Sequence, residues 1–223
     1  MSEDTKKTAW DHNTAWQNQA VARNYDHRRF TSWSGRLFNS LEQRALSRLL
    51  DLAEKAQPVT KVLDAACGTG RISSLLCARG YDLTSTDISE DMLAVARERL
   101  NAAAEQVIFE KADIYNLPFP ADHFDCVTCI RLFQHLSPDE RASALSELGR
   151  VTKRHVIVNV TYHSSYYGAL RRLRQWVGRY APRYSCSEAE LRAATQAAGL
   201  TVVKRIFPQP LYNANLVLLI EKP

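Results

Sequence analysis

The sequence lacks the features that would place the protein in a membrane or on the secretory route. No run of 18 apolar residues occurs among its 223 residues, so no transmembrane helix is expected. Residues 1–7 are polar and have no apolar core, so no secretory signal is visible. The five cysteines are scattered and odd in number, as in reduced proteins, and the chain has no internal repeat. We therefore expect a cytoplasmic globular protein.

Metal-binding signals are also lacking. Cys126 and Cys129 have the spacing of a redox or metal pair, but they lie in an apolar run typical of a strand. Side chains three residues apart on a strand point to opposite faces. No second cysteine pair or histidine cluster accompanies them. We expect two packed free thiols and no metal site.

What the chain does contain is 45% apolar residues, enough for one α/β domain with a small addition. The expected strands are 61–65, 81–86, 106–110, 125–130, 155–161, 201–207 and 215–221. The expected helices between them are 71–79, 90–103, 138–151 and 187–198. This alternation predicts a mostly parallel sheet with helices on both faces.

Two segments stand apart from that core of residues 58–223. Residues 1–57 are predicted to form a helical N-terminal cap. Within it, Ser34–Gly35 suggests a break before a helix over 37–55. The apolar face expected for this helix consists of Leu41, Ala45, Leu49 and Leu52. Residues 162–185 interrupt the alternation and are predicted to form a basic helical lid over the substrate.

The most informative run is Val62–Gly70, a buried strand that ends at Asp64 and turns through small residues into a helix. Glycine lets a ligand approach the backbone closely, and a helix N-terminus offers unpaired N–H groups. A dinucleotide site would want a third glycine where Ser73 stands, and Asp64 would repel a pyrophosphate. An NAD-dependent oxidoreductase is therefore a distant alternative. S-adenosylmethionine suits the loop better, because it carries an ammonium group and no phosphate.

The chain resembles the class I S-adenosylmethionine-dependent methyltransferases, in the broad group that contains the ubiquinone and menaquinone enzymes. The resemblance covers roughly residues 58–223 and rests on motifs in the family's order: Asp64–Gly70, Asp87–Ser89, Ala112–Ile114, Leu117–Phe119, Phe124–Val127, Arg131–Leu136, Ser187–Leu191 and Ala198–Leu200. It implies a Rossmann-like seven-stranded sheet whose last strand is antiparallel.

The resemblance also implies which residues bind the cofactor. They are Tyr25, Asp64, Ala65, Ala66, Gly68, Gly70, Asp87, Ile88, Met92, Ala112, Asp113, Ile114 and Ile130. Asp64 is expected on the ammonium group, and Asp87 on both ribose hydroxyls. Asp113 is expected on the adenine amino group, or in a local turn bond.

His135 and Tyr25 are the catalytic candidates. The imidazole of His135 has an ordinary pKa of about 6.5, which suits proton transfer, although this residue could simply bridge strand and helix. Tyr25 matches a family tyrosine over the methionine end of the cofactor, or is an aromatic packing residue. Arg131 is expected either to bind an anionic group of the substrate or to pair with a nearby acid.

Further substrate contacts are expected from His163, Tyr166, Tyr167 and Arg171 in the lid. The stretch 149–187 has eight Lys or Arg residues and no acid. Its basic helix could meet an anionic substrate, an anionic membrane surface or only solvent. Nucleic acid is disfavoured, because no recognised RNA-binding module is present.

The sequence thus predicts methyl transfer from S-adenosylmethionine to a small molecule, anionic or lipid-linked, with O- or N-methylation preferred. The alternatives are C-methylation of a quinone-type ring and a non-catalytic subunit that only binds S-adenosylmethionine. A monomer or a homodimer is expected.

Overall fold

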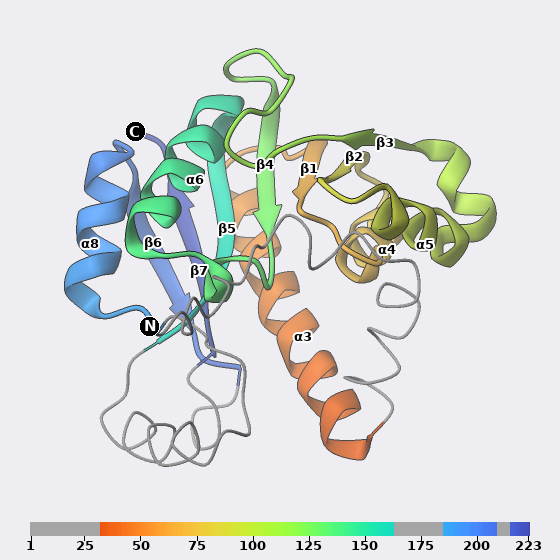
Figure 1. Ribbon diagram of the computed structural model, residues 1–223, viewed down its shortest axis with the longest axis horizontal. Helices are drawn as coiled ribbons and strands as arrows, with labels where there is room; N and C mark the ends of the chain where they lie inside the picture. The colour runs from red at the N-terminus through yellow and green to blue at the C-terminus, as the bar shows by residue number, and fades with distance from the viewer. Residues whose placement is uncertain (1–31, 163–184, 209–214) are drawn as a thin grey trace, which may run out of the picture.

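A seven-stranded sheet forms the centre of the computed structural model, which describes residues 32–162, 185–208 and 215–223 (Figure 1). Its strands are β1 (Lys61–Ala65), β2 (Asp82–Asp87), β3 (Val107–Lys111), β4 (Phe124–Cys129), β5 (Thr152–Thr161), β6 (Thr201–Ile206) and β7 (Asn215–Glu221). They lie in the order β3-β2-β1-β4-β5-β7-β6. The first five of these are parallel, whereas β7 is antiparallel to both β5 and β6. The predicted Rossmann-like sheet with an antiparallel last strand is confirmed.

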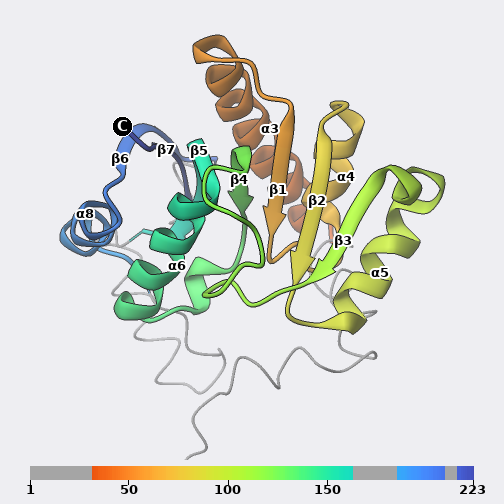
Figure 2. The same cartoon turned by 90° about the horizontal axis from the view of Figure 1, so that it is seen from above.

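Helices cover both faces of the sheet (Figure 2). They are α3 (Trp33–Ala56), α4 (Arg71–Ala78), α5 (Glu90–Leu100), α6 (Pro138–Val151) and α8 (Glu188–Ala197), with short 3₁₀ helices η1 (Asn101–Gln106) and η2 (Phe133–His135). Side chains of α3 and α4 and the end of α5 share one apolar cluster with the sheet. Side chains of α6 and α8 form a second apolar cluster with the sheet. The sheet is therefore buried on both sides.

Burial on both faces explains the continuous apolar run of β5. Val156 and Val158 belong to one cluster and Ile157 between them to the other, which is the two-residue period of a strand. Cys126 and Cys129 likewise belong to different clusters, on opposite faces of the sheet. Both are buried free thiols, as predicted. Within the described part of the chain, no group of three or more His, Cys, Asp or Glu side chains could hold a metal. In that part, no helix is long and apolar enough to cross a bilayer.

Helix α3 differs from expectation in its start and in its buried face. The predicted break at Ser34–Gly35 is wrong, because Ser32 caps the helix by accepting the Gly35 N–H at 3.1 Å. Leu52 is 38% exposed, so its place on the apolar face was also wrong. The buried side chains are Glu42, Ala45, Leu46, Leu49, Leu50 and Ala53. A search for apolar spacing misses this face because it contains a glutamate.

Serine caps fix where the helices after the strands begin. Ser89, Ser137 and Ser187 each accept a backbone N–H from the first turn of α5, α6 and α8. Helix α5 ends at Leu100 rather than at the predicted 103, because Asn101 adopts a positive φ of 50°. These caps determine where the loops that precede the three helices end.

Candidate functional site

The loop after β1 turns sharply by using the left-handed backbone region. Ala66, Gly68 and Gly70 have φ values of 54°, 56° and 74°. A Cβ on Gly70 would lie 2.8 Å from the Cβ of Ala96, so this glycine permits close packing of α4 on α5. A Cβ on Gly68 would meet no atom within 4 Å. Gly68 therefore leaves the loop backbone open to a ligand.

Asp64, near the end of β1, is held in place by two hydroxyl groups. It is 1% exposed and accepts hydrogen bonds from Ser73 Oγ at 2.6 Å and Thr128 Oγ1 at 3.0 Å. Ser85 Oγ donates in turn to Ser73 Oγ at 3.1 Å. Burial raises the pKa of Asp64 to about 6 against the lowering effect of these hydrogen bonds. A cationic ligand group would relieve the cost of this buried charge.

Asp87, the last residue of β2, is oriented by backbone N–H groups. Its Oδ2 accepts from Gly68 N at 2.8 Å and its Oδ1 from Ser89 N at 3.0 Å. Burial raises the pKa of this carboxyl, while the backbone hydrogen bonds lower it. The carboxylate thus joins the glycine loop to the start of α5, with each oxygen retaining capacity to accept a further donor.

One cavity lies against these two carboxylates. Among the predicted site residues, it is lined by Asp64, Ala66, Gly68, Asp87, Ile88, Met92, Ala112, Asp113, Ile114, Ile130, Arg131 and His135. Ala65 and Gly70 do not line it. Ala65 is fully buried in the strand, and Gly70 is committed to packing against α5. Residues far apart in the sequence therefore meet because β1, β2 and β4 are neighbours in the sheet.

The wall beyond β2 and β3 is largely apolar. Met92 from α5 and Ile88 and Ile114 from the loops line it together, as a flat aromatic ligand ring would require. Asp113 also lines the cavity, while its Oδ1 accepts from Tyr115 N at 3.0 Å. The local turn bond considered for Asp113 is thus present, and its second oxygen can still accept a donor.

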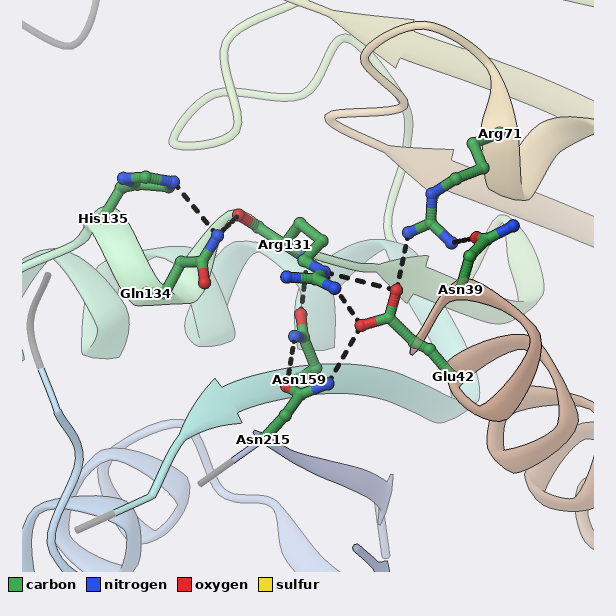
Figure 3. A network of polar contacts seen from close by, with 8 residues as sticks. All are labelled: Asn39, Glu42, Arg71, Arg131, Gln134, His135, Asn159 and Asn215. Carbon is green, nitrogen blue, oxygen red and sulfur yellow. Dashed lines mark hydrogen bonds and ion pairs between the residues drawn. The ribbon is translucent and has the colours of Figure 1, made fainter. Parts of the chain in front are cut away.

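Arg131, just after β4, belongs to a buried polar network (Figure 3). Its Nε lies 2.9 Å from Glu42 Oε1, so the interpretation of Arg131 as one half of a salt bridge holds. Arg71 Nη2 lies 2.7 Å from Glu42 Oε2. The guanidinium of Arg131 also lies 4.2 Å from the centre of the Phe38 ring. Both arginines line the cavity, whereas Glu42 lies behind them.

Comparison with known proteins agrees with this geometry. Residues 62–155 match the family model described as a methyltransferase domain. This stretch of the chain is therefore similar to methyltransferase domains. The resemblance drawn from the sequence motifs is therefore confirmed.

Curated proteins that this chain is similar to include enzymes named for quinones. The demethylmenaquinone methyltransferase of Thermus thermophilus is 39% identical over 106 residues, 47% of each chain. The ubiquinone biosynthesis O-methyltransferase of Azoarcus is 33% identical over 93 residues, 40% of each chain. The chain thus spans about half the length of the curated relatives it matches, or less.

Among solved structures, the magnesium protoporphyrin IX methyltransferase of Synechocystis PCC 6803 with bound SAH has the same fold. The TM-score is 0.74 at 19% identity, over 92% of this chain and all of that one. At such identity the likeness concerns the fold.

His135 ends η2 and lines the cavity. Its Nε2 lies 3.1 Å from Gln134 Nε2, which also donates to the Arg131 carbonyl at 3.1 Å. Gln134 therefore positions the ring (Figure 3). A histidine in this place can hold or transfer a proton near a bound acceptor.

Some predicted residues lie outside the described part of the chain: Tyr25, His163, Tyr166, Tyr167 and Arg171. Other lining residues were missed by sequence reasoning: Cys67, Thr69, Arg71, Ile72, Thr86, Tyr115, Leu132 and Leu136. Arg71 could have been found, because it follows Gly70 directly and opens the helix. Its partner Glu42 gives no such signal.

Proposed function

We propose that this protein transfers a methyl group from S-adenosylmethionine to a small-molecule acceptor. The observation that carries the proposal is the pair of buried carboxylates, Asp64 and Asp87, on either side of an open glycine loop at one cavity. A pyrophosphate would be repelled by this pair. An ammonium group would pair with the carboxylate of Asp64, and two ribose hydroxyls would donate hydrogen bonds to the carboxylate of Asp87.

Each residue then has a defined task. Asp64 binds the ammonium group, and Asp87 accepts from the ribose hydroxyls. Ile88, Met92 and Ile114 pack against the adenine. Bound S-adenosylmethionine supplies an electrophilic methyl group on its sulfonium. The protein positions the acceptor in line with that methyl, and positioning alone can supply most of the rate.

The acceptor is expected beside Arg131 and His135. His135 would take a proton from a phenol or amine, since a general base helps only where a proton must leave. Arg71 and Arg131 both line the cavity, and guanidinium groups at its wall favour an anionic acceptor. The relatives named for demethylmenaquinone and ubiquinone support a quinone-type ring as a second candidate, whether methylated on oxygen or on carbon.

The test of the cofactor is calorimetric titration with S-adenosylmethionine and S-adenosylhomocysteine, with NAD as the control ligand. We expect micromolar binding of both sulfur ligands, none of NAD, and loss of binding in Asp87→Ala. Absence of binding by the wild-type protein, or binding of NAD in preference, would contradict the proposal. Release of S-adenosylhomocysteine in the presence of phenolic and quinol acceptors then separates an enzyme from a subunit that only binds the cofactor.

A further inference from the structure

Glu42 is a fully buried charge on the side of the two arginines away from the cavity. It lies on α3, is 0% exposed, and does not itself line the cavity. Its carboxylate accepts from Arg71, Arg131 and, at 3.0 Å, from Asn215 Nδ2 (Figure 3). A buried carboxylate is stable only with such full pairing, so this group is tied to its arginines.

The same network holds the backbone from which Arg131 projects. Asn215 Oδ1 accepts from Asn159 Nδ2 at 2.8 Å, and Asn159 Oδ1 accepts the Arg131 N–H. Arg131 has a φ of 78°, a region that a side chain disfavours. Such a conformation persists only where its surroundings fix it, and it is found at functional sites. The network thus fixes both ends of Arg131.

Charge balance gives this arrangement a consequence for the ligand. S-adenosylmethionine carries one more positive charge than S-adenosylhomocysteine, because its sulfur is a sulfonium. The guanidinium groups of Arg71 and Arg131 at the cavity wall disfavour that extra charge, and Glu42, at ion-pair distance from both, counteracts them. Loss of Glu42 would therefore shift the balance of charge at the cavity away from the cationic substrate and toward the neutral product.

We propose that Glu42 is a positioning residue that holds Arg71 and Arg131 at the cavity wall and sets the preference between sulfonium substrate and thioether product. This inference rests on the proposed use of S-adenosylmethionine. Glu42 touches neither ligand and acts through the arginines. Its loss would increase product inhibition.

The test compares Glu42→Gln with Glu54→Gln by calorimetry with both sulfur ligands. Glu54 is a matched control, because it lies on the same helix and pairs with an arginine, Arg79, but is 37% exposed and lies away from the cavity. For the loss of a unit charge near a partly solvated site, we expect the affinity ratio of S-adenosylmethionine to S-adenosylhomocysteine to fall about fivefold in Glu42→Gln. Glu54→Gln should leave the ratio unchanged.

A merely structural role of Glu42 would weaken both ligands alike and leave the ratio at its wild-type value, which would overturn the inference. Arg71→Met supplies an independent test that does not depend on Glu42→Gln folding. It removes one positive charge, so the ratio should rise about threefold. A fall or no change there would also overturn the inference. Failure of the wild-type protein to bind either ligand would instead overturn the proposed function itself.

Discussion

Replacing Gly70 with alanine tests the packing that shapes the glycine loop. Gly70 has a φ of 74°, which costs an L residue about 1 kcal/mol. The new Cβ would also lie 2.8 Å from Ala96 Cβ and 3.0 Å from Ala96 Cα. Neither atom can rotate away, because one is backbone and the other is fixed to it. Helix α5 must therefore move, at a cost of about 2 kcal/mol.

The sum is a loss of about 3 kcal/mol in the free energy of unfolding. For a domain of this size, it corresponds to a fall in Tm of about 6–12 °C. Gly80→Ala is the matched control. Gly80 has a φ of 80°, but its Cβ would meet no atom within 4 Å. We expect only the backbone cost there, about 1 kcal/mol and about 2–4 °C.

Thermal unfolding followed by circular dichroism, together with urea titration, measures both variants. An equal loss of stability in Gly70→Ala and Gly80→Ala would refute the reasoning. It would mean that the contact between the new Cβ and Ala96 costs no free energy of unfolding. Ligand affinity is not needed for this comparison. The test therefore addresses the loop geometry separately from the proposed function.

Two further predictions concern the acid and the base at the cavity. Burial raises the pKa of Asp64 to about 6, so the unliganded folded state binds this proton more tightly than the unfolded state. The resulting stability is fully present only below the unfolded pKa of 3.8 and is lost as pH rises through 6, by about 3 kcal/mol in all, of which about 2 kcal/mol is lost between pH 4.5 and 7.5. Asp64→Asn should remove this fall in urea titrations at pH 4.5 and 7.5 and should abolish cofactor binding; an unchanged pH dependence would contradict the argument. His135→Asn should slow methyl transfer at least tenfold with little change in cofactor affinity. A matching loss of affinity would instead make His135 a cofactor contact.

Local signals in the sequence were sufficient to predict much of the fold. The strands follow from short apolar runs bounded by glycine or polar residues, and β1 and β7 have the predicted limits. Asp64 and Asp87 could be placed because each comes at the carboxyl end of such a run. The carboxyl ends of parallel neighbours meet at one edge, so both acids reach the same cavity.

The polar network could not be predicted in this way. Glu42 and Asn215 are 173 residues apart, and nothing in the local spacing of either indicates the other. The sequence left two interpretations of Arg131 open. Its partner Glu42 lies 89 residues away, on a helix whose buried face was predicted incorrectly. Ser73 illustrates the same limit. It stood out as a missing glycine, yet its role is to donate a hydrogen bond to Asp64.

The position of β7 between β5 and β6 has a consequence during synthesis on the ribosome. Strand β5 ends at Thr161, but the strand that covers its open edge begins only at Asn215. At 5–20 residues per second, the apolar edge of β5 stays unpaired for roughly 3–10 s, and β6, once synthesised, has no neighbour in the sheet until β7 follows. An open apolar edge is a template for association with other chains. The nascent protein therefore passes through an interval in which chaperones have a defined strand to protect.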